Sequence, residues 1–282
     1  MNPLSSKALL VSVTISQWTA RKVDARATDT AHVAHKATRA AGKYHKRLLP
    51  DAPELAKISA ISSNIRKYVN DQTLPWLTDG TRILSGKNYF NFTSTIQAMR
   101  GEFDRAVLEF KQTYPSLKMK AIQDLGDLYT GAEYPDLESL SDKFGVSVDF
   151  FPMPDKSDFR VEISEFEKSE FERKIKDTEN KAMRDIGNRL LSVLKIATER
   201  LSDPSAIFRE SLLENIKEMA SLVPSLNIHD DPTLDSIGLD TKKLVESLDV
   251  EELRKNKGQR NIARDSLQEI ELRMGAYMGA NK

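Results

Sequence analysis

Cationic side chains gather in one stretch near the N-terminus of this 282-residue chain, and their spacing suits the binding of a polyanion. Residues 19–49 hold eight Lys and Arg against two Asp, a net charge of +6, although the whole chain has 42 basic and 42 acidic residues. A row of cations binds phosphates because each contact releases condensed counterions. The candidate nucleic-acid-binding cations are Arg21, Lys22, Arg26, Lys36, Arg39, Lys43 and Arg47.

The second half of this stretch has the period of an amphipathic helix. Small and apolar residues recur every three to four positions, at Val33, Ala37, Ala40, Tyr44 and Leu48. The opposite side would carry His32, Lys36, Arg39, Lys43 and Arg47. This spacing predicts one helix from about residue 29 until Pro50 ends it, with the cations on its exposed face.

An aromatic loop is the second feature that favours nucleic acid. Residues 71–92 contain Pro75, two glycines and several rings, which predicts a structured loop of about twenty residues. We expect Trp76 in this loop to stack on bases, since ring stacking is the sequence-tolerant part of single-strand binding. Single-stranded DNA is therefore the expected partner.

An acidic block offers a competing explanation of the basic stretch. Residues 225–252 hold eight Asp and Glu against two Lys, a net charge of −6. Blocks of opposite sign on one chain attract each other, within a subunit or between subunits. The basic residues could therefore dock on residues 225–252 instead of binding an external polyanion.

Other candidate sites are weaker. His32 and His35 have the one-turn spacing of metal ligands, but the cations beside them disfavour a divalent ion and no acidic cluster completes the set. Lys87 follows Gly86, but Asn88 stands where a phosphate-binding loop requires Ser or Thr. We expect no metal, no cofactor and no catalysis, with an enzyme of scattered site residues as the remaining alternative.

The elements that would position these residues form an α+β chain, mostly helical. A strand is predicted at residues 9–16 and a β-hairpin at 146–163, and the hairpin should pair with the strand because two strands alone are marginal. Helices are predicted to break at Pro115, to start at Ser164 with a capping box, and to run antiparallel over long lengths. The predicted domains are 1–163, α+β, and 164–282, long helices with an acidic linker.

Composition bounds the compartment and the assembly. The chain has no cysteine, which excludes disulfides and thiolate metal sites and favours a cytoplasmic location. No stretch has the length of apolar sequence that a membrane span needs, so no membrane contact is expected. Apolar helix stripes and opposed charge blocks predict a homo-oligomer.

Three segments carry a resemblance to known proteins: "LPWLTDGTRIL", "FPMPDKSDFRVEIS" and the closing "MGAYMG". Together with the N-terminal strand that runs into "WTARK", their order resembles an uncharacterised family encoded by tailed bacteriophages and some plasmids. Some relatives lie beside a MoxR-type AAA ATPase and a von Willebrand A-domain protein, and others beside DNA replication genes. The resemblance implies a role in phage DNA metabolism or, alternatively, an adaptor for a protein such as the AAA ATPase.

Overall fold

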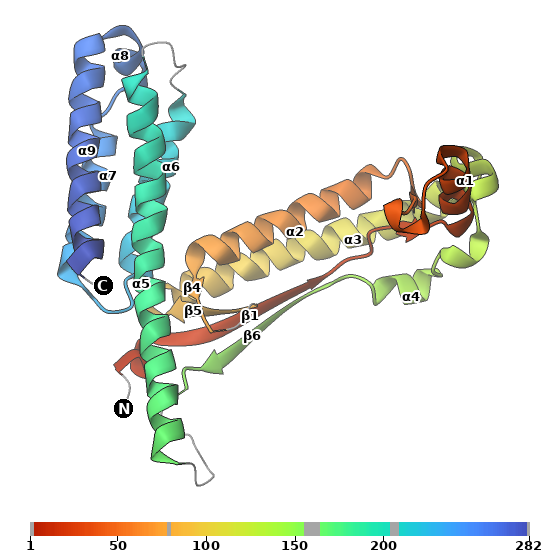
Figure 1. Ribbon diagram of the computed structural model, residues 1–282, viewed down its shortest axis with the longest axis horizontal. Helices are drawn as coiled ribbons and strands as arrows, with labels where there is room; N and C mark the ends of the chain where they lie inside the picture. Colours follow the sequence, from red (N-terminus) through yellow and green to blue (C-terminus); the bar gives the residue numbers. More distant parts are fainter. Residues whose placement is uncertain (1–2, 78–79, 155–163, 204–208, 281–282) are drawn as a thin grey trace. The chain divides into compact units, whose positions relative to one another are not determined.

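A computed structural model describes residues 3–77, 80–154, 164–203 and 209–280 (Figure 1). As the sequence predicts, the described chain is α+β and mostly helical. It divides into two compact units, which we call unit 1 (1–12, 68–93 and 149–282) and unit 2 (13–67 and 94–148). The predicted division at 163/164 is different, because it cuts the chain once. The two units instead alternate along the sequence, and four elements contribute residues to both of them.

The main sheet is antiparallel, with strand order β4-β5-β1-β6. Its strands are β1 (Ala8–Ser16), β4 (Leu74–Pro75), β5 (Thr81–Ser85) and β6 (Gly145–Pro152). The predicted pairing of the central hairpin with the N-terminal strand is confirmed for the first hairpin strand, since β6 lies beside β1. The second predicted strand, Phe159–Ile163, lies outside the described residues. The predicted aromatic loop contains β4 and β5, so it is part of the sheet.

Unit 1 is built on long antiparallel helices and one short helix (Figure 1). They are α5 (Glu165–Ser202), α6 (Glu210–Leu226), α7 (Pro232–Glu246), α8 (Val250–Lys255) and α9 (Lys257–Ala280). Helix α5 packs on α6 and α9, and the buried apolar side chains of these helices form a continuous core. The start of α5 is as predicted, because Ser164 and Glu167 form a reciprocal capping box.

Unit 2 consists of parts of two longer helices and a set of smaller elements. The long helices are α2 (Pro53–Gln72) and α3 (Tyr89–Leu125), linked by the Lys57–Glu109 ion pair at 2.5 Å. The smaller ones are β2 (Arg21–Val23), α1 (Ala25–His35), β3 (His45–Arg47) and α4 (Leu137–Ser141), with 3-10 turns at Arg39–Ala41, Gly126–Leu128 and Gly131–Glu133. Strands β2 and β3 pair as an antiparallel ribbon.

The predicted helix break at Pro115 is wrong, because α3 runs through this proline. A proline inside a helix removes one hydrogen bond and costs about 3 kcal/mol. Phe110, Tyr114 and Ala121 are buried on the face of α3 around this point, and the Tyr114 hydroxyl donates to the Pro135 carbonyl at 2.8 Å. Burial of these side chains offsets the cost of the proline, so the helix continues.

The predicted amphipathic helix over residues 29–48 is also wrong. Helix α1 ends at His35, where Lys36 adopts a left-handed conformation and the amides of Lys36 and Ala37 close a Schellman-type end. No residue of α1 is buried, and Val33 is 79% exposed. Two of the five residues on the expected apolar face, Ala37 and Ala40, are alanines, so that face offered little area to bury. The observed fold instead buries Leu48 and Leu49.

No helix in the described ranges is both long enough and apolar enough to cross a membrane.

Candidate nucleic-acid interface

The β2–β3 ribbon sorts its cations onto two faces. Arg21 lies opposite Arg47, and Lys22 lies opposite Lys46. Side chains alternate between the faces of a strand, so the two arginines share one face and the two lysines share the other. We call these the arginine face and the lysine face. The residues come together by strand pairing, which the predicted helix would not have allowed.

The hydrogen bonds that flank the ribbon fix how close these pairs are. The Leu48 amide donates to the Ala20 carbonyl at 2.7 Å, and the Asp24 amide donates to the Tyr44 carbonyl at 2.9 Å. In an antiparallel pair, hydrogen-bonded and non-hydrogen-bonded positions alternate, which makes Arg21 and Arg47 a non-hydrogen-bonded pair. At such positions the Cα atoms approach to about 4.5 Å and the side chains are closest.

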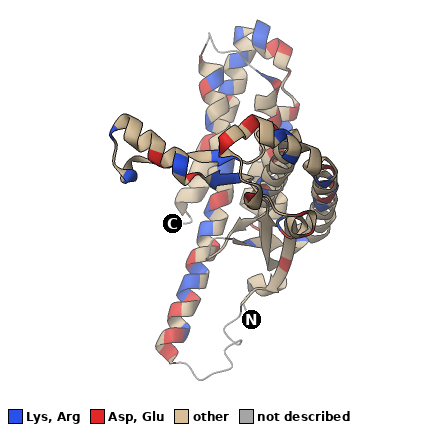
Figure 2. Ribbon diagram, turned by 90° about the vertical axis from the view of Figure 1, so that its right-hand side faces the viewer, with Lys and Arg blue, Asp and Glu red and all other residues tan. Residues whose placement is uncertain are grey.

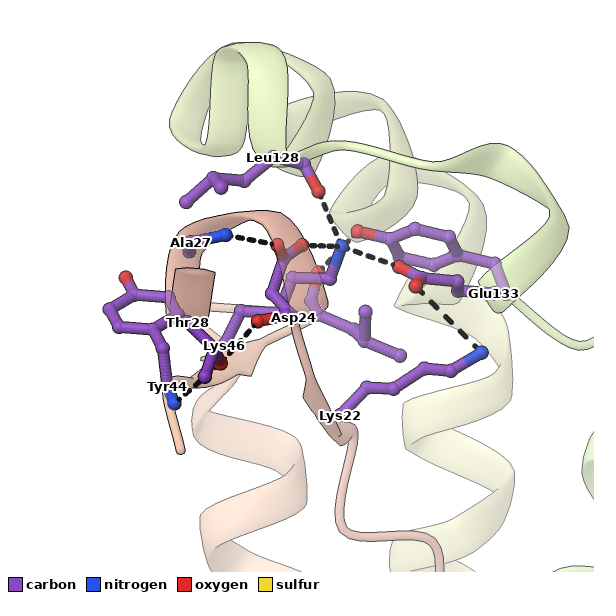
Figure 3. Close-up of polar contacts among 10 residues, drawn as sticks. Lys22, Asp24, Ala27, Thr28, Tyr44, Lys46, Leu128 and Glu133 are labelled. Atoms are coloured by element: carbon purple, nitrogen blue, oxygen red, sulfur yellow. Dashed lines mark hydrogen bonds and ion pairs between the residues drawn. The ribbon is translucent and has the colours of Figure 1, made fainter. Parts of the chain in front are cut away.

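The lysine face is closed by acidic groups from two other segments. Lys46 is only 2% exposed, and its Nζ lies 2.8 Å from a carboxylate oxygen of Asp24 and 2.8 Å from one of Glu133. It also donates to the Leu128 carbonyl at 2.6 Å, as Figure 3 shows. Lys22 on the same face lies 3.7 Å from Glu133. This network ties the ribbon to the start of α1 and to the turns at 126–133.

The pKa values of Lys46 and Asp24 are both shifted in the direction that favours the charged form. Burial by itself would lower the pKa of Lys46, but hydrogen bonds to Asp24 and Glu133 outweigh it and raise the pKa above its usual value. The pKa of Asp24 is lowered, first by the hydrogen bond from the Ala27 amide and then by Lys46. Asp24 is the N-cap of α1, so one carboxylate both starts the helix and neutralises the buried lysine.

The arginine face carries no such partner. Arg21 and Arg47 are exposed, and neither forms an ion pair with any residue in the described ranges. Arg26, Lys36 and Lys43 are also exposed and likewise have no ion pair among these residues. Figure 2 shows Lys and Arg in blue recurring over the α1 region, which faces the viewer there. Two like charges held directly opposite each other destabilise a sheet, so an anion is the natural complement of this face.

The remaining predicted cation has a weak partner. Arg39 lies 3.5 Å from Asp29, and both side chains are more than half exposed. Exposed ion pairs of this kind are worth about 0–1 kcal/mol and exchange readily with other anions. Arg39 therefore adds to the positive potential of the region without being held in place.

His32 makes a contact within unit 2. Its Nε2 lies 3.0 Å from the Gly42 carbonyl oxygen, which only accepts, so this nitrogen donates. The contact ties α1 to the loop that leads into β3. Among the residues that the structure places, no group of three or more His, Asp or Glu side chains is arranged to hold a metal ion.

Trp76 and Trp18 have different surroundings. Trp76 is partly buried and packs against the core of unit 1, whereas the seven predicted cations all belong to unit 2. Trp18 belongs to unit 2 and is half-buried, with its ring 5.9 Å from that of Tyr114 and 6.4 Å from that of Phe110. Of the two tryptophans, Trp18 is the one that shares a compact unit with the arginine face.

The acidic block at 225–252 has ion-pair partners in its own unit. The cations that pair with it are Lys7, Lys87, Lys217, Arg254, Lys255 and Arg273. Asp230 accepts from both Lys7 and Lys87, and these hydrogen bonds lower its pKa to about 2. All six cations belong to unit 1, so the acidic block is partly neutralised there.

Sequence reasoning missed Lys46 as a buried residue and missed the opposition of the two arginines. Lys46 was counted among the cations of the basic stretch, but nothing in its own segment shows that Glu133 covers it. The signal that could have revealed the ribbon is the pair of short segments "ARKV" and "HKRLL", which have strand-like apolar ends and are separated by an alanine-rich stretch with Gly42.

No family model matches this chain, and no curated protein or solved structure matches it either.

Proposed function

We propose that unit 2 binds nucleic acid, with a preference for single-stranded DNA, through the exposed cations between Arg21 and Arg47. The observation that carries the proposal is that five of these cations form no ion pair within the described residues, in a chain with equal numbers of acids and bases. These five, which we call the free cations, are Arg21, Arg26, Lys36, Lys43 and Arg47. Phosphates from outside the chain would neutralise them.

The free cations come from β2, α1, the loop after α1, and β3, all within unit 2. Such a surface would bind phosphates along a strand and release counterions at each of them, which makes affinity strongly dependent on salt. The preference for a single strand is supported by the half-buried ring of Trp18, because unpaired bases can stack on aromatic side chains. Trp76 stays a predicted stacking ring of its own, in unit 1.

The biological setting is proposed from the resemblance to phage and plasmid proteins. A protein of this kind would act in phage DNA metabolism, in the cytoplasm of a bacterial host, as a homo-oligomer and without catalysis of its own. Light scattering tests the assembly: an oligomer gives a multiple of the 31.8 kDa chain mass, whereas a single-chain mass at micromolar concentration contradicts it.

Fluorescence polarisation with a labelled single-stranded oligonucleotide over a salt series tests the binding. Replacement of two free cations, Arg26→Glu and Lys43→Glu, should weaken binding by tenfold or more at low salt, since fewer phosphates are neutralised and fewer counterions are released. The slope of log affinity against log salt should become shallower by roughly 0.7 for each phosphate that is no longer neutralised. Arg26 lies in the first turn of α1, where Glu is compatible with the helix dipole, so the fold should persist.

Lys181→Glu combined with Lys195→Glu is the matched control, because it makes the same charge change at two exposed lysines of unit 1. It should leave the affinity close to that of the wild-type chain. An equal fall in affinity in the control and the double variant would mean that only net charge matters. Absence of binding to single-stranded DNA or RNA at low salt would overturn the proposal.

The second candidate function is an adaptor for a protein partner, for which an AAA ATPase is the proposal from the resemblance. A group of exposed rings in unit 1 favours it: Phe90 is 83% exposed, Phe150 is 36% exposed, and Tyr89 contacts both of them. Exposed apolar groups that cluster on a surface are typical of protein contacts. Replacement of Phe90 and Phe150 by Ser should abolish capture of the partner and leave nucleic-acid binding unchanged.

A further inference from the structure

A pocket of about 390 Å³ lies beside the arginine face, entirely within unit 2. Its walls come from the link between β1 and β2 and the first residue of β2 (Gln17–Arg21), from Arg47 and the turn after it, and from the first two turns of α2. The volume falls in the range of small-molecule sites, roughly 300–1,000 Å³. The pocket is therefore large enough for more than a lone inorganic anion.

The polar lining consists of donors and hydroxyls without a carboxylate. It comprises Arg21, Arg47, Gln17, Thr19 and Ser59. Leu55 and Ala56 of the first turn of α2 also line it, and the Ala56 amide donates to the Ala52 carbonyl at 3.3 Å. The one acidic residue of that turn, Glu54, is not among the lining residues. All the charge that faces the pocket is thus positive.

The apolar lining is on the side of α2 and the β1–β2 corner. Trp18, Leu49, Leu55 and Ile58 supply it, and Trp18 is braced by Phe110 and Tyr114 behind it. Ala20, between Trp18 and Arg21 in the wall, has a φ of 49°, a left-handed conformation that a residue with a Cβ seldom adopts. Such strained positions concentrate at ligand sites, where the surrounding structure holds them.

We propose that this pocket binds a phosphomonoester attached to a ring, as in a nucleotide, with the phosphate at Arg21 and Arg47 and the ring against the apolar lining. The charge of the ligand follows from the charge of the site. A phosphomonoester carries about −1.5 to −2 at neutral pH, which matches two guanidinium groups, whereas a phosphodiester inside a strand carries one negative charge. Arginine also binds phosphate in a bidentate manner, and the close Arg21–Arg47 pair can grip it from two sides.

The source of this ligand is assigned from the proposed function and rests on it. The ligand is the terminal phosphate and terminal nucleotide of a DNA strand. A free nucleotide has the same chemistry and is the other source. The two differ in an observable way, because a strand end also contacts the free cations outside the pocket, such as Lys43, and a mononucleotide does not reach them.

The test compares oligo(dT) with a 5′-phosphate, with a 3′-phosphate and with hydroxyl ends, in fluorescence polarisation, together with competition by dTMP, thymidine and inorganic phosphate. A phosphorylated end should bind about tenfold more tightly than the hydroxyl end, since one charge-assisted hydrogen bond of this type is worth a factor of that order. The dTMP should compete better than either thymidine or phosphate alone, because it fills both parts of the pocket.

Arg47→Ala and Arg21→Ala should each remove the advantage of the phosphorylated end, while Lys43→Ala should weaken both ends equally. Ser59→Trp, which fills the pocket and keeps both arginines, should also remove the advantage. Equal affinity for all ends, with no competition by dTMP, would overturn the pocket and leave the proposed strand binding intact. Binding of dTMP that depends on Arg47, without any oligonucleotide binding, would overturn the strand proposal and identify a site for free nucleotides.

Discussion

The two faces of the β2–β3 ribbon carry two cations each, yet their surroundings are opposite. On the lysine face, Lys46 is buried and held by Asp24, Glu133 and a backbone carbonyl. On the arginine face, Arg21 and Arg47 are exposed beside a pocket whose lining contains no carboxylate. Lys46 and Arg47 are adjacent in sequence but lie on opposite faces of β3. The face on which a cation lies decides whether it is neutralised inside the fold.

This contrast shows that the net charge of a stretch says little about how much of it is available to a ligand. Lys46 contributes to the +6 of residues 19–49 but is neutralised inside the fold. The arginines contribute to the same total and are left open. Stability should therefore depend on the lysine face, and binding should depend on the arginine face.

The largest effect that separates the faces should come from Lys46→Met. Removal of the ammonium leaves the carboxylates of Asp24 and Glu133 close together without a cation, so the free energy of unfolding should fall by about 3 kcal/mol. Arg47→Ala, at the adjacent exposed position, should change it by less than about 0.5 kcal/mol. Urea denaturation followed by circular dichroism measures both. Similar destabilisation in the two variants would contradict the division between the faces.

A pH series should separate the faces next. The pKa of Asp24 is lower in the folded chain than its unfolded value near 3.8. The ionised Asp24 carboxylate therefore stabilises the fold above pH 3.8, and this stabilisation is lost as pH falls through the pKa of the folded state. The pKa of Lys46 is raised, so its contribution is present below 10.5 and is lost only as pH rises through the folded value. Stability should fall below about pH 4, and Asp24→Asn should flatten this fall.

The melting temperature across pH 2–6 provides this measurement, with Asp29→Asn as the matched control. Asp29 is in the same helix but has only the exposed contact to Arg39. If the melting temperature of Asp24→Asn falls with pH as steeply as that of the wild-type chain, other carboxylates dominate acid unfolding.

The smallest effect on stability, and the most informative, is expected from Arg21→Glu. It places a carboxylate opposite Arg47, so the free energy of unfolding should rise by roughly 0.2–1 kcal/mol, the value of a cross-strand opposite-charge pair. Binding of phosphorylated ligands should be lost in the same variant, because the anion site is now filled by the chain itself. Thermal melting and polarisation on one protein sample show both effects.

Lys22→Glu is the control for this change, since it makes the same reversal on the lysine face. It brings a second carboxylate near Glu133 and should lower stability while leaving the binding of phosphate ends unchanged. A variant Arg21→Glu that becomes less stable would show that the two arginines are not held against each other.

Much of the helical architecture could be predicted from local sequence. Ser164 and Glu167 mark the start of α5, and the apolar period of 175–201 places its buried side, because both signals depend only on residues within a few turns of each other. The site was harder to predict. A helical period of small and apolar residues at 33–48 was present, but the period alone does not measure how much apolar area the resulting face can bury.

The sequence by itself determined that the chain is a mostly helical α+β protein, that residues 19–49 carry an excess of cations over acids, and that β6 pairs with β1. These properties follow from composition, from period and from the need of a short hairpin for a third strand. Only the tertiary structure decided which cations are open. Glu133 reaches Lys46 across 87 positions of sequence, and Arg21 meets Arg47 across 26, so their pairing depends on chain packing that no local pattern encodes.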